Sequence, residues 1–252
     1  EKFVFIYSRN QNHVMMFDTS GKFIRKIGRV GQGPGEIANI DFFTVSDNLV
    51  FIYPFSRNGS LTVYDMRDNS FVKEIPLKWP VFFSRAIDVM GDCLVYYPGT
   101  VYSPDNSKTF ISACVANGEG ETLMEQIPYL SSGDKKILQL SSDPSWLYRG
   151  RSNVYSFIND TIYGITCDSI FPRYHLSLGK YKLPSGRYDP THDYGWGDFV
   201  LMQSVYETKE FLFFKFWFDK KLWFSRYDKK TERIDSWEQT PFKAHRCTGY
   251  NE

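Results

Sequence analysis

Few residues in this chain have the types and spacing that could carry chemistry. The densest group lies at residues 188–198, where His192 and Asp193 are accompanied by Asp189 and Asp198. Oxygen-rich loops of this kind can bind calcium. The spacing matches no EF-hand, however, and His192 has no second histidine at a metal-ligand spacing. We therefore expect a solvated loop, with no bound metal and no cofactor.

A second candidate is the glycine-rich segment 28–36, whose backbone amides could hold a phosphate. The segment lacks a Gly-Lys-Ser/Thr ending, and residues 42–45, which follow it, predict a strand rather than a helix. We expect the glycines to provide positive φ angles in a tight crossing between structural units. Glu36 is expected to bond the turn amides.

Nucleophilic catalysis has no clear signature either. The chain contains no Gly-x-Ser-x-Gly motif, and its Ser, His and Asp residues are too common to define a triad. The four cysteines, Cys93, Cys114, Cys167 and Cys247, include no Cys-x-x-Cys pair, so we expect buried free thiols. We assign no catalytic residue.

Composition excludes two classes of partner. The 30 Lys and Arg residues are balanced by 29 Asp and Glu residues, so the basic surface of a nucleic-acid-binding protein is not expected. No apolar run is long enough to span a membrane, since residues 211–218 include Lys215 and have the length of one strand. With 42% hydrophobic and 18% aromatic residues, the chain is expected to fold around a substantial core.

The elements that position these residues are predicted by internal repeats. The tetrapeptide Val-Phe-Ile-Tyr at residues 4–7 recurs at 50–53, and a related run follows at 94–98. Strands ending in an aromatic residue and Asp recur at 14–18, 61–65 and 223–228, each followed by a polar turn and another strand. A period in the mid-forties is typical of β-propeller blades.

The second unit predicts four antiparallel strands at 41–45, 49–53, 61–65 and 71–75. Similar units are expected at 85–127, at about 137–178 and at 199–237. A lone blade cannot bury both of its faces, so blades must pack around an axis. We predict an all-β fold, a single β-propeller domain over residues 1–252 with truncation at one or both ends left open. Its interblade layers are expected to contain Phe42, Phe51, Tyr96, Phe213 and Trp217.

Blade 1 begins at the position of a second strand, because nothing precedes Phe3 that could form the innermost one. Either residues 240–247 supply that strand and close the ring, or residues absent from this chain do. Five blades are expected if the chain is complete. Six blades are favoured by the resemblance described next.

The run Gly21-Lys22-Phe23 to Ile27-Gly28, followed by Gly31-Gln32-Gly33-Pro34-Gly35-Glu36, is similar to the junction of NHL-type propellers. More closely, it resembles a signature of a family of bacterial six-bladed β-propeller proteins, mostly envelope lipoproteins. Residues 157–163, with 172–174 and 179–180, resemble a second signature of that family. The resemblance implies six blades and export to the cell envelope but no reaction. The chain departs from the family in lacking the leader, the lipid-bearing cysteine and an early strand.

The loops after second strands and between blades emerge on one face of a propeller, and function commonly lies on such loops. We predict a non-enzymatic protein of the bacterial cell envelope that recognises a protein, peptide or glycan through this face. The alternatives are a lyase or hydrolase at the channel mouth, with or without a divalent metal, and a structural module of a larger assembly. The predicted ligand-binding residues are Arg9, Asn12, Arg29, Gln32, Glu36, Arg57, Asn58, His192, Asp193 and Trp196.

Overall fold

The computed structural model describes residues 2–8, 13–54, 59–79, 81, 87–102, 108–111, 113–126, 145–155, 160–182 and 197–239. This part of the chain consists of strands and one short 3-10 helix, η1 (Gly179–Tyr181), so the predicted all-β class is confirmed. Of the strands β10 and β11 only the backbone is described. No helix within these ranges is long and apolar enough to cross a membrane.

The strands form five antiparallel blades that follow one another along the chain. Four blades have four strands and blade 1 has three; neighbouring strands within a blade are antiparallel, and in blade 3 a separate two-strand sheet lies in the chain between the second and third strands. Blade 1 contains β1 (Phe3–Ser8), β2 (His13–Asp18) and β3 (Phe23–Ile27); blade 2 contains β4 (Ile40–Ser46), β5 (Leu49–Pro54), β6 (Ser60–Asp65) and β7 (Phe71–Pro76); blade 3 contains β8 (Ile87–Met90), β9 (Cys93–Tyr96), β12 (Ala113–Asn117) and β13 (Thr122–Gln126); blade 4 contains β14 (Ser145–Tyr148), β15 (Arg151–Tyr155), β16 (Thr161–Ile165) and β17 (Ile170–His175); blade 5 contains β18 (Leu201–Glu207), β19 (Phe211–Phe218), β20 (Lys221–Asp228) and β21 (Ile234–Glu238).

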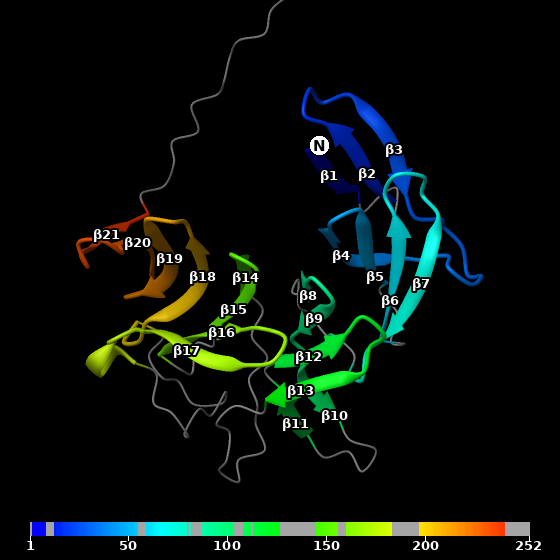
Figure 1. The fold of residues 1–252 in the computed structure, drawn as a ribbon. Coiled ribbons are helices and arrows are strands. Elements are labelled where there is room, and N and C mark those ends of the chain that lie inside the picture. Colours follow the sequence, from blue (N-terminus) through cyan, green and yellow to red (C-terminus); the bar gives the residue numbers. More distant parts are fainter. Residues whose placement is uncertain are drawn as a thin grey trace, which may run out of the picture.

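The blades follow an arc around a common centre (Figure 1), which confirms the β-propeller fold. The strands β4, β8, β14 and β18 lie toward the centre, and the last strand of each blade lies outermost. The arc stays open between blade 1 and blade 5. The described residues hold five blades, and a sixth is not among them.

Blade 1 repeats the last three strands of blade 2. Strand β1 pairs with β2 as β5 pairs with β6, which places the two Val-Phe-Ile-Tyr motifs at equivalent positions. The equivalent strands β2 and β6 end in Asp18 and Asp65, whose carboxylates accept hydrogen bonds from turn amides two residues later. Asp228 in blade 5 has the same role. The recurrent aspartate is therefore a turn-forming residue.

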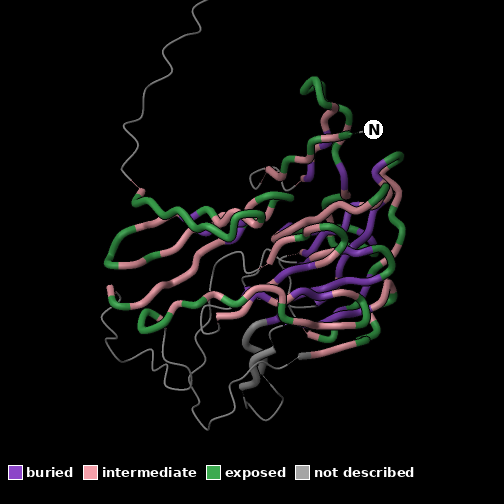
Figure 2. Tube along the Cα trace, turned by 60° about the vertical axis from the view of Figure 1, so that its left-hand side comes forward, coloured by how far each residue is buried: buried purple, intermediate pink, exposed green. Residues whose placement is uncertain are grey.

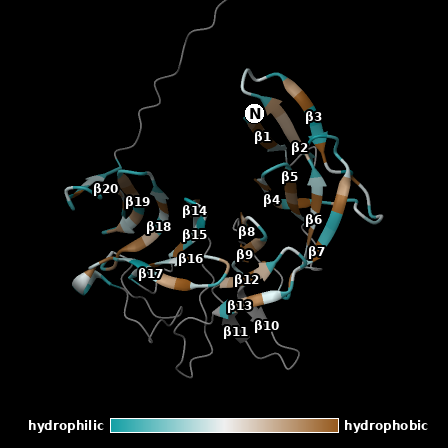
Figure 3. Cartoon of the chain, in the orientation of Figure 1, coloured by the Kyte–Doolittle hydropathy of each residue, from teal (hydrophilic) through white to brown (hydrophobic). Residues whose placement is uncertain are grey.

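Apolar side chains fill the layers between neighbouring blades. Alternate residues of a strand point to opposite faces, so each blade contributes to two layers. Val14 and Tyr64 lie between blades 1 and 2, and Leu61 and Tyr96 between blades 2 and 3. Hydrophobic residues are concentrated in the strands (Figure 3), and burial is deepest around blades 2 and 3 (Figure 2). This packing is the main stabilising contribution to the fold.

Most of the rings predicted for these layers lie there. Phe51 and Tyr96 are buried between blades 2 and 3, and Phe42 packs against them. Trp217 is a correction, because it is 39% exposed. It lies on the face of β19 that points away from blade 4, as Phe213 does, since Leu212 and Phe214 occupy the other face.

Two backbone features were not predicted. In blade 3 a hairpin of β10 (Gly99–Tyr102) and β11 (Lys108–Ile111) is inserted between β9 and β12. In blades 1 to 4 a bulge leaves one extra residue in the outermost strand, and the register shifts there. The extra residues are Ile24, Val72, Leu123 and Arg173. Strand β21 of blade 5 pairs with β20 without such a shift.

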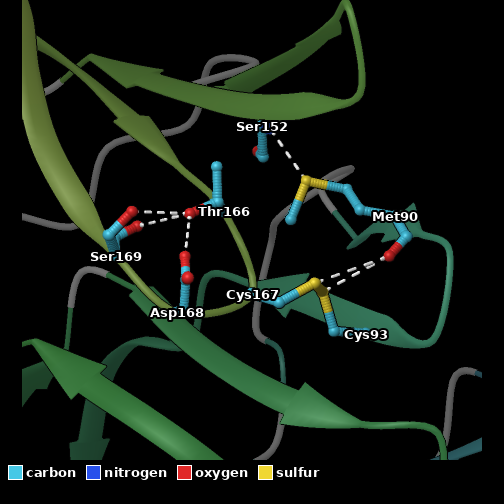
Figure 4. The surroundings of a disulfide bond; sticks show 7 residues. All are labelled: Met90, Cys93, Ser152, Thr166, Cys167, Asp168 and Ser169. Carbon is cyan, nitrogen blue, oxygen red and sulfur yellow. Dashed lines mark hydrogen bonds between the residues drawn. A yellow bond between two sulfur atoms is a disulfide. The ribbon is translucent and has the colours of Figure 1, made fainter.

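The prediction of free thiols was wrong for two cysteines. Cys93 on β9 and Cys167, in the turn after β16, form a disulfide that joins blade 3 to blade 4 (Figure 4). Cys114 is a buried free thiol, as predicted. Cys247 lies outside the described residues. A bond between positions 74 residues apart could not be recognised from cysteine spacing alone.

Candidate functional site

The glycine-rich segment forms a compact loop that connects β3 to β4, across the junction of blades 1 and 2. The Gly33 amide donates to Glu36 Oε2 at 2.9 Å, and the Glu36 amide donates to the Gly33 carbonyl oxygen at 2.9 Å. The Ile37 amide donates to the Arg29 carbonyl oxygen at 2.7 Å. The predicted role of Glu36 in bonding the turn is therefore confirmed.

Blade 2 holds this loop from the side. Tyr64 of β6 donates a hydrogen bond to the Gly35 carbonyl oxygen and accepts one from the Arg29 amide. Asn69, in the turn between β6 and β7, accepts from the Gly28 amide at 2.9 Å. Gly35 has a φ of +70°, and the Phe71 ring lies where a β-carbon would be. The glycines provide the backbone angles and the close approach that this crossing requires.

Six amides of the loop are used within the protein. Those of Gly28, Arg29, Gly31, Gly33, Glu36 and Ile37 all donate to protein acceptors. They are thus not available to hold a phosphate. The side chains of Arg29 and Gln32 are exposed on this rigid loop. This surface therefore offers a ligand the charged guanidinium group of Arg29 and the amide group of Gln32 as hydrogen-bonding partners.

The structure brings together three of the predicted binding residues, Arg29, Gln32 and Glu36. The loop that carries them packs at the end of blade 2 where β6 turns into β7. The other seven lie outside the described residues: Arg9, Asn12, Arg57, Asn58, His192, Asp193 and Trp196. Their clustering with the first three stays a prediction.

A polar cluster between blades 3 and 4 was missed by the sequence analysis. Asp88 on β8 accepts a hydrogen bond from the Ser152 hydroxyl, which lies 2.5 Å from the Tyr97 hydroxyl. Burial raises the pKa of Asp88, and hydrogen bonds from Ser152 and Ser145 oppose this shift. Burial also raises the pKa of Tyr97. The sequence signal for this cluster was Asp88 itself, a carboxyl group between the apolar residues Ile87 and Val89 on a short inner strand.

A second polar cluster fixes blade 4 to blade 5. The Glu207 side chain has no exposed surface, and its Oε1 lies 2.8 Å from Lys229 Nζ and 2.9 Å from Arg173 Nη2. Its Oε2 accepts from Arg173 Nη1 at 2.8 Å and from the Trp146 ring nitrogen at 3.1 Å. Burial opposes ionisation of Glu207, but these donors win and lower its pKa to about 2. Since every oxygen of Glu207 is paired within the protein, the cluster is a structural connection.

Metal-ligand chemistry has little support in the described ranges. They contain no group of three His, Cys, Asp or Glu side chains that could hold a metal ion. Of the four residues considered for calcium, only Asp198 lies within these ranges. Residues 188–193 lie outside the described ranges, so the expectation of a solvated loop there stays a prediction.

Solved structures with a similar fold are known. A protein from Bacteroides fragilis NCTC 9343, described provisionally as exported, aligns over 94% of this chain and 69% of its own, with a TM-score of 0.70 and 19% identity. Apo AztD from Citrobacter koseri aligns over 93% and 57%, with a TM-score of 0.43 and 12% identity. The β-propeller domain of Cps50 (Swd1) from Myceliophteria thermophila aligns over 94% and 97%, with a TM-score of 0.38 and 11% identity.

At 19% identity the Bacteroides fragilis structure supports the fold alone. No curated protein matches the chain. The comparisons do not confirm the resemblance to NHL-type propellers and envelope lipoproteins, which stays a prediction. The sequence profile of a domain of unknown function, DUF4934, matches residues 1–248, and the chain therefore belongs to the DUF4934 family.

Proposed function

We propose that this protein is a non-enzymatic binding propeller that recognises a protein, peptide or glycan through the loop carrying Arg29 and Gln32. The observation that carries the proposal is the construction of the loop between β3 and β4. Its backbone is fixed by internal hydrogen bonds and by Tyr64 and Asn69, while both side chains stay exposed. A surface held rigid before the ligand arrives loses little entropy on binding.

Arg29 and Gln32 define the chemistry of the ligand. A guanidinium group pairs well with planar carboxylates, and an amide both donates and accepts hydrogen bonds. Acidic peptides and acidic sugars provide such groups. The remaining predicted residues, among them Trp196 and Arg57, would extend the surface if they lie beside this loop.

We place the protein in the cell envelope. The interblade disulfide supports folding in an oxidising compartment. The Bacteroides fragilis neighbour is described provisionally as exported. Attachment through a lipid is supported only by the resemblance to envelope lipoproteins.

We also propose that a sixth blade closes the ring. Ile6 of blade 1 is 47% exposed, on the face of β1 opposite to the residues that pack against blade 2. At the other end of the arc, Trp217 and Tyr206 are exposed on the face of blade 5 that points away from blade 4. Each end of the arc therefore exposes an apolar sheet face. Between neighbouring blades, faces of this kind are covered by the adjacent blade.

Binding is tested by probing an array of acidic oligosaccharides and peptides with the purified protein. Affinity for any ligand found is then measured by calorimetry for the wild type and for Arg29→Ala/Gln32→Ala. We expect the double variant to bind at least about tenfold more weakly, which corresponds to about 1.4 kcal/mol.

The matched control is Arg233→Ala, which removes an exposed arginine from the turn between β20 and β21 of blade 5. It is expected to leave the affinity unchanged. Equal affinity of the double variant and the control would exclude this loop as the binding surface.

A further inference from the structure

The disulfide joins cysteines that are not neighbours in the sequence. Cys114 lies between Cys93 and Cys167 in the chain, yet it is free. In blade 3, Cys93 lies opposite Asn117 and Cys114 lies opposite Tyr96. The pleat directs Cys93 toward blade 4 and Cys114 toward blade 2. Once blade 3 has folded, Cys93 and Cys114 therefore cannot pair.

An unfolded chain would favour the wrong bond. Cys93 and Cys114 are 21 residues apart, against the 74 residues between Cys93 and Cys167. Because the probability of loop closure falls with loop length to the power of about 3/2, the short loop closes about six to seven times more often. The native pairing is therefore favoured when blade 3 has folded, and so has separated Cys93 from Cys114, before the sulfurs react.

The turn that carries Cys167 is held without the disulfide (Figure 4). The Thr166 amide donates to the Ser169 carbonyl oxygen, and the hydroxyls of Thr166 and Ser169 lie 2.6 Å apart. Asp168 accepts a hydrogen bond from the Thr166 hydroxyl at 2.7 Å. Cys167 is exposed on this turn, whereas Cys93 is 2% exposed. Of the two cysteines, Cys167 is therefore the more accessible to a reagent from solution once the bond is reduced.

We propose that the Cys93–Cys167 bond is formed on two folded blades by thiol–disulfide exchange that enters at Cys167, with the disulfide of an oxidoreductase as oxidant. The Cys167 thiolate attacks a sulfur of the oxidoreductase, forms a mixed disulfide and releases one oxidoreductase thiolate. The Cys93 thiolate then attacks the Cys167 sulfur and releases the second. Two protons leave the chain, the released thiolates take up two, and the oxidoreductase is reduced to a dithiol.

Cys114 stays out of this exchange. It is fully enclosed between blades 2 and 3, and burial raises the pKa of its thiol to about 11. Since the thiolate is the nucleophile, a thiol with so high a pKa reacts slowly at neutral pH. The inference rests on the two faces of blade 3 and does not depend on the proposed ligand.

The test uses the reduced, folded protein with oxidised glutathione as the disulfide, in a Cys247→Ser background, followed by alkylation and peptide mapping. We expect the parent to form only Cys93–Cys167. Cys93→Ala is expected to accumulate glutathione on Cys167 and none on Cys114. In Cys167→Ala, glutathione should modify Cys93. We expect this reaction to be at least about tenfold slower than the modification of Cys167 in Cys93→Ala. In 6 M urea, Cys93–Cys114 should exceed Cys93–Cys167 by about sixfold.

Formation of Cys93–Cys114 by the folded protein, or glutathione on Cys114 as fast as on Cys167, would overturn the inference. The double variant Cys93→Ala/Cys167→Ala shows whether the blades fold without the disulfide. It is expected to keep the circular dichroism of the wild type, including the near-ultraviolet aromatic signal. Loss of that signal would show that the bond precedes the blades, which also contradicts the proposal.

Discussion

Glu207 and Asp88 are carboxyl groups in interblade layers, and their surroundings act in opposite directions. Two cations and a ring nitrogen surround Glu207 and favour its charged form. Asp88 is paired with neutral hydroxyls, so burial dominates and its charged form is disfavoured. The number of cationic donors within reach therefore decides the sign of the shift.

The substitution Glu207→Gln tests the cluster between blades 4 and 5. It leaves Arg173 and Lys229 without their shared carboxylate, so we expect a loss of about 3 kcal/mol in the free energy of unfolding. Thermal denaturation should show a melting temperature lower by about 6 to 12 °C. Glu232→Gln, at an exposed turn, is the matched control. A loss no larger than that of the control would contradict the assigned role of Glu207.

The lowered pKa of Glu207 also predicts that the wild type and Glu207→Gln differ in how their free energy of unfolding depends on pH. The pKa of Glu207 is about 2 in the folded protein, below its ordinary value of 4.5. Its contribution to stability is therefore present above pH 4.5 and is lost as the pH falls toward 2. Denaturation as a function of pH should show a smaller decline for Glu207→Gln than for the wild type in this window.

The sequence identified little of this residue chemistry. Glu36 was predictable because a carboxylate beside glycines in a tight turn accepts hydrogen bonds from the nearest free donors, which are the turn amides. Glu207 and Arg173 were not, because they are 34 residues apart and meet only when two blades pack. Arg173 is moreover the extra residue of a bulge, and strand periodicity does not reveal bulges.

Among the elements, the strands of blade 2 were the most predictable. The expected strands at 41–45, 49–53, 61–65 and 71–75 agree with β4 to β7 to within one residue at each end. Alternating apolar residues and Asp-containing turns specify each strand locally. The hairpin β10–β11 was missed because a polar insertion within a blade breaks the repeat without altering its flanking strands.

The substitution Gly35→Ala tests the loop between β3 and β4. The φ of +70° disfavours alanine, and its β-carbon would lie 2.7 Å from the Phe71 ring. We expect a loss of about 2 kcal/mol or more. Gly21→Ala is the control, since Gly21 has a φ of +85° but open space around it. If chemical denaturation gave equal losses for the two variants, the contact with Phe71 would contribute nothing.

For the whole molecule, the two open ends of the arc lead to a prediction about ring closure. If a sixth blade covers them, Ile6→Lys and Trp217→Lys place a charge inside an interblade layer. We then expect each substitution to lower the free energy of unfolding by about 2 kcal/mol relative to Val72→Lys. Val72 is an exposed apolar residue of the outermost strand of blade 2. Losses equal to that of Val72→Lys would leave both faces open to solvent.

The bulges of blades 1 to 4 have a consequence for how these molecules behave in concentrated solution. An extra residue in an outermost strand interrupts the row of free amide and carbonyl groups, so a strand from another molecule cannot align along it. Strand β21 has no such interruption, and it exposes Ile234 and Trp237 beside that regular edge. Aggregation by edge-to-edge addition is therefore expected to begin at blade 5.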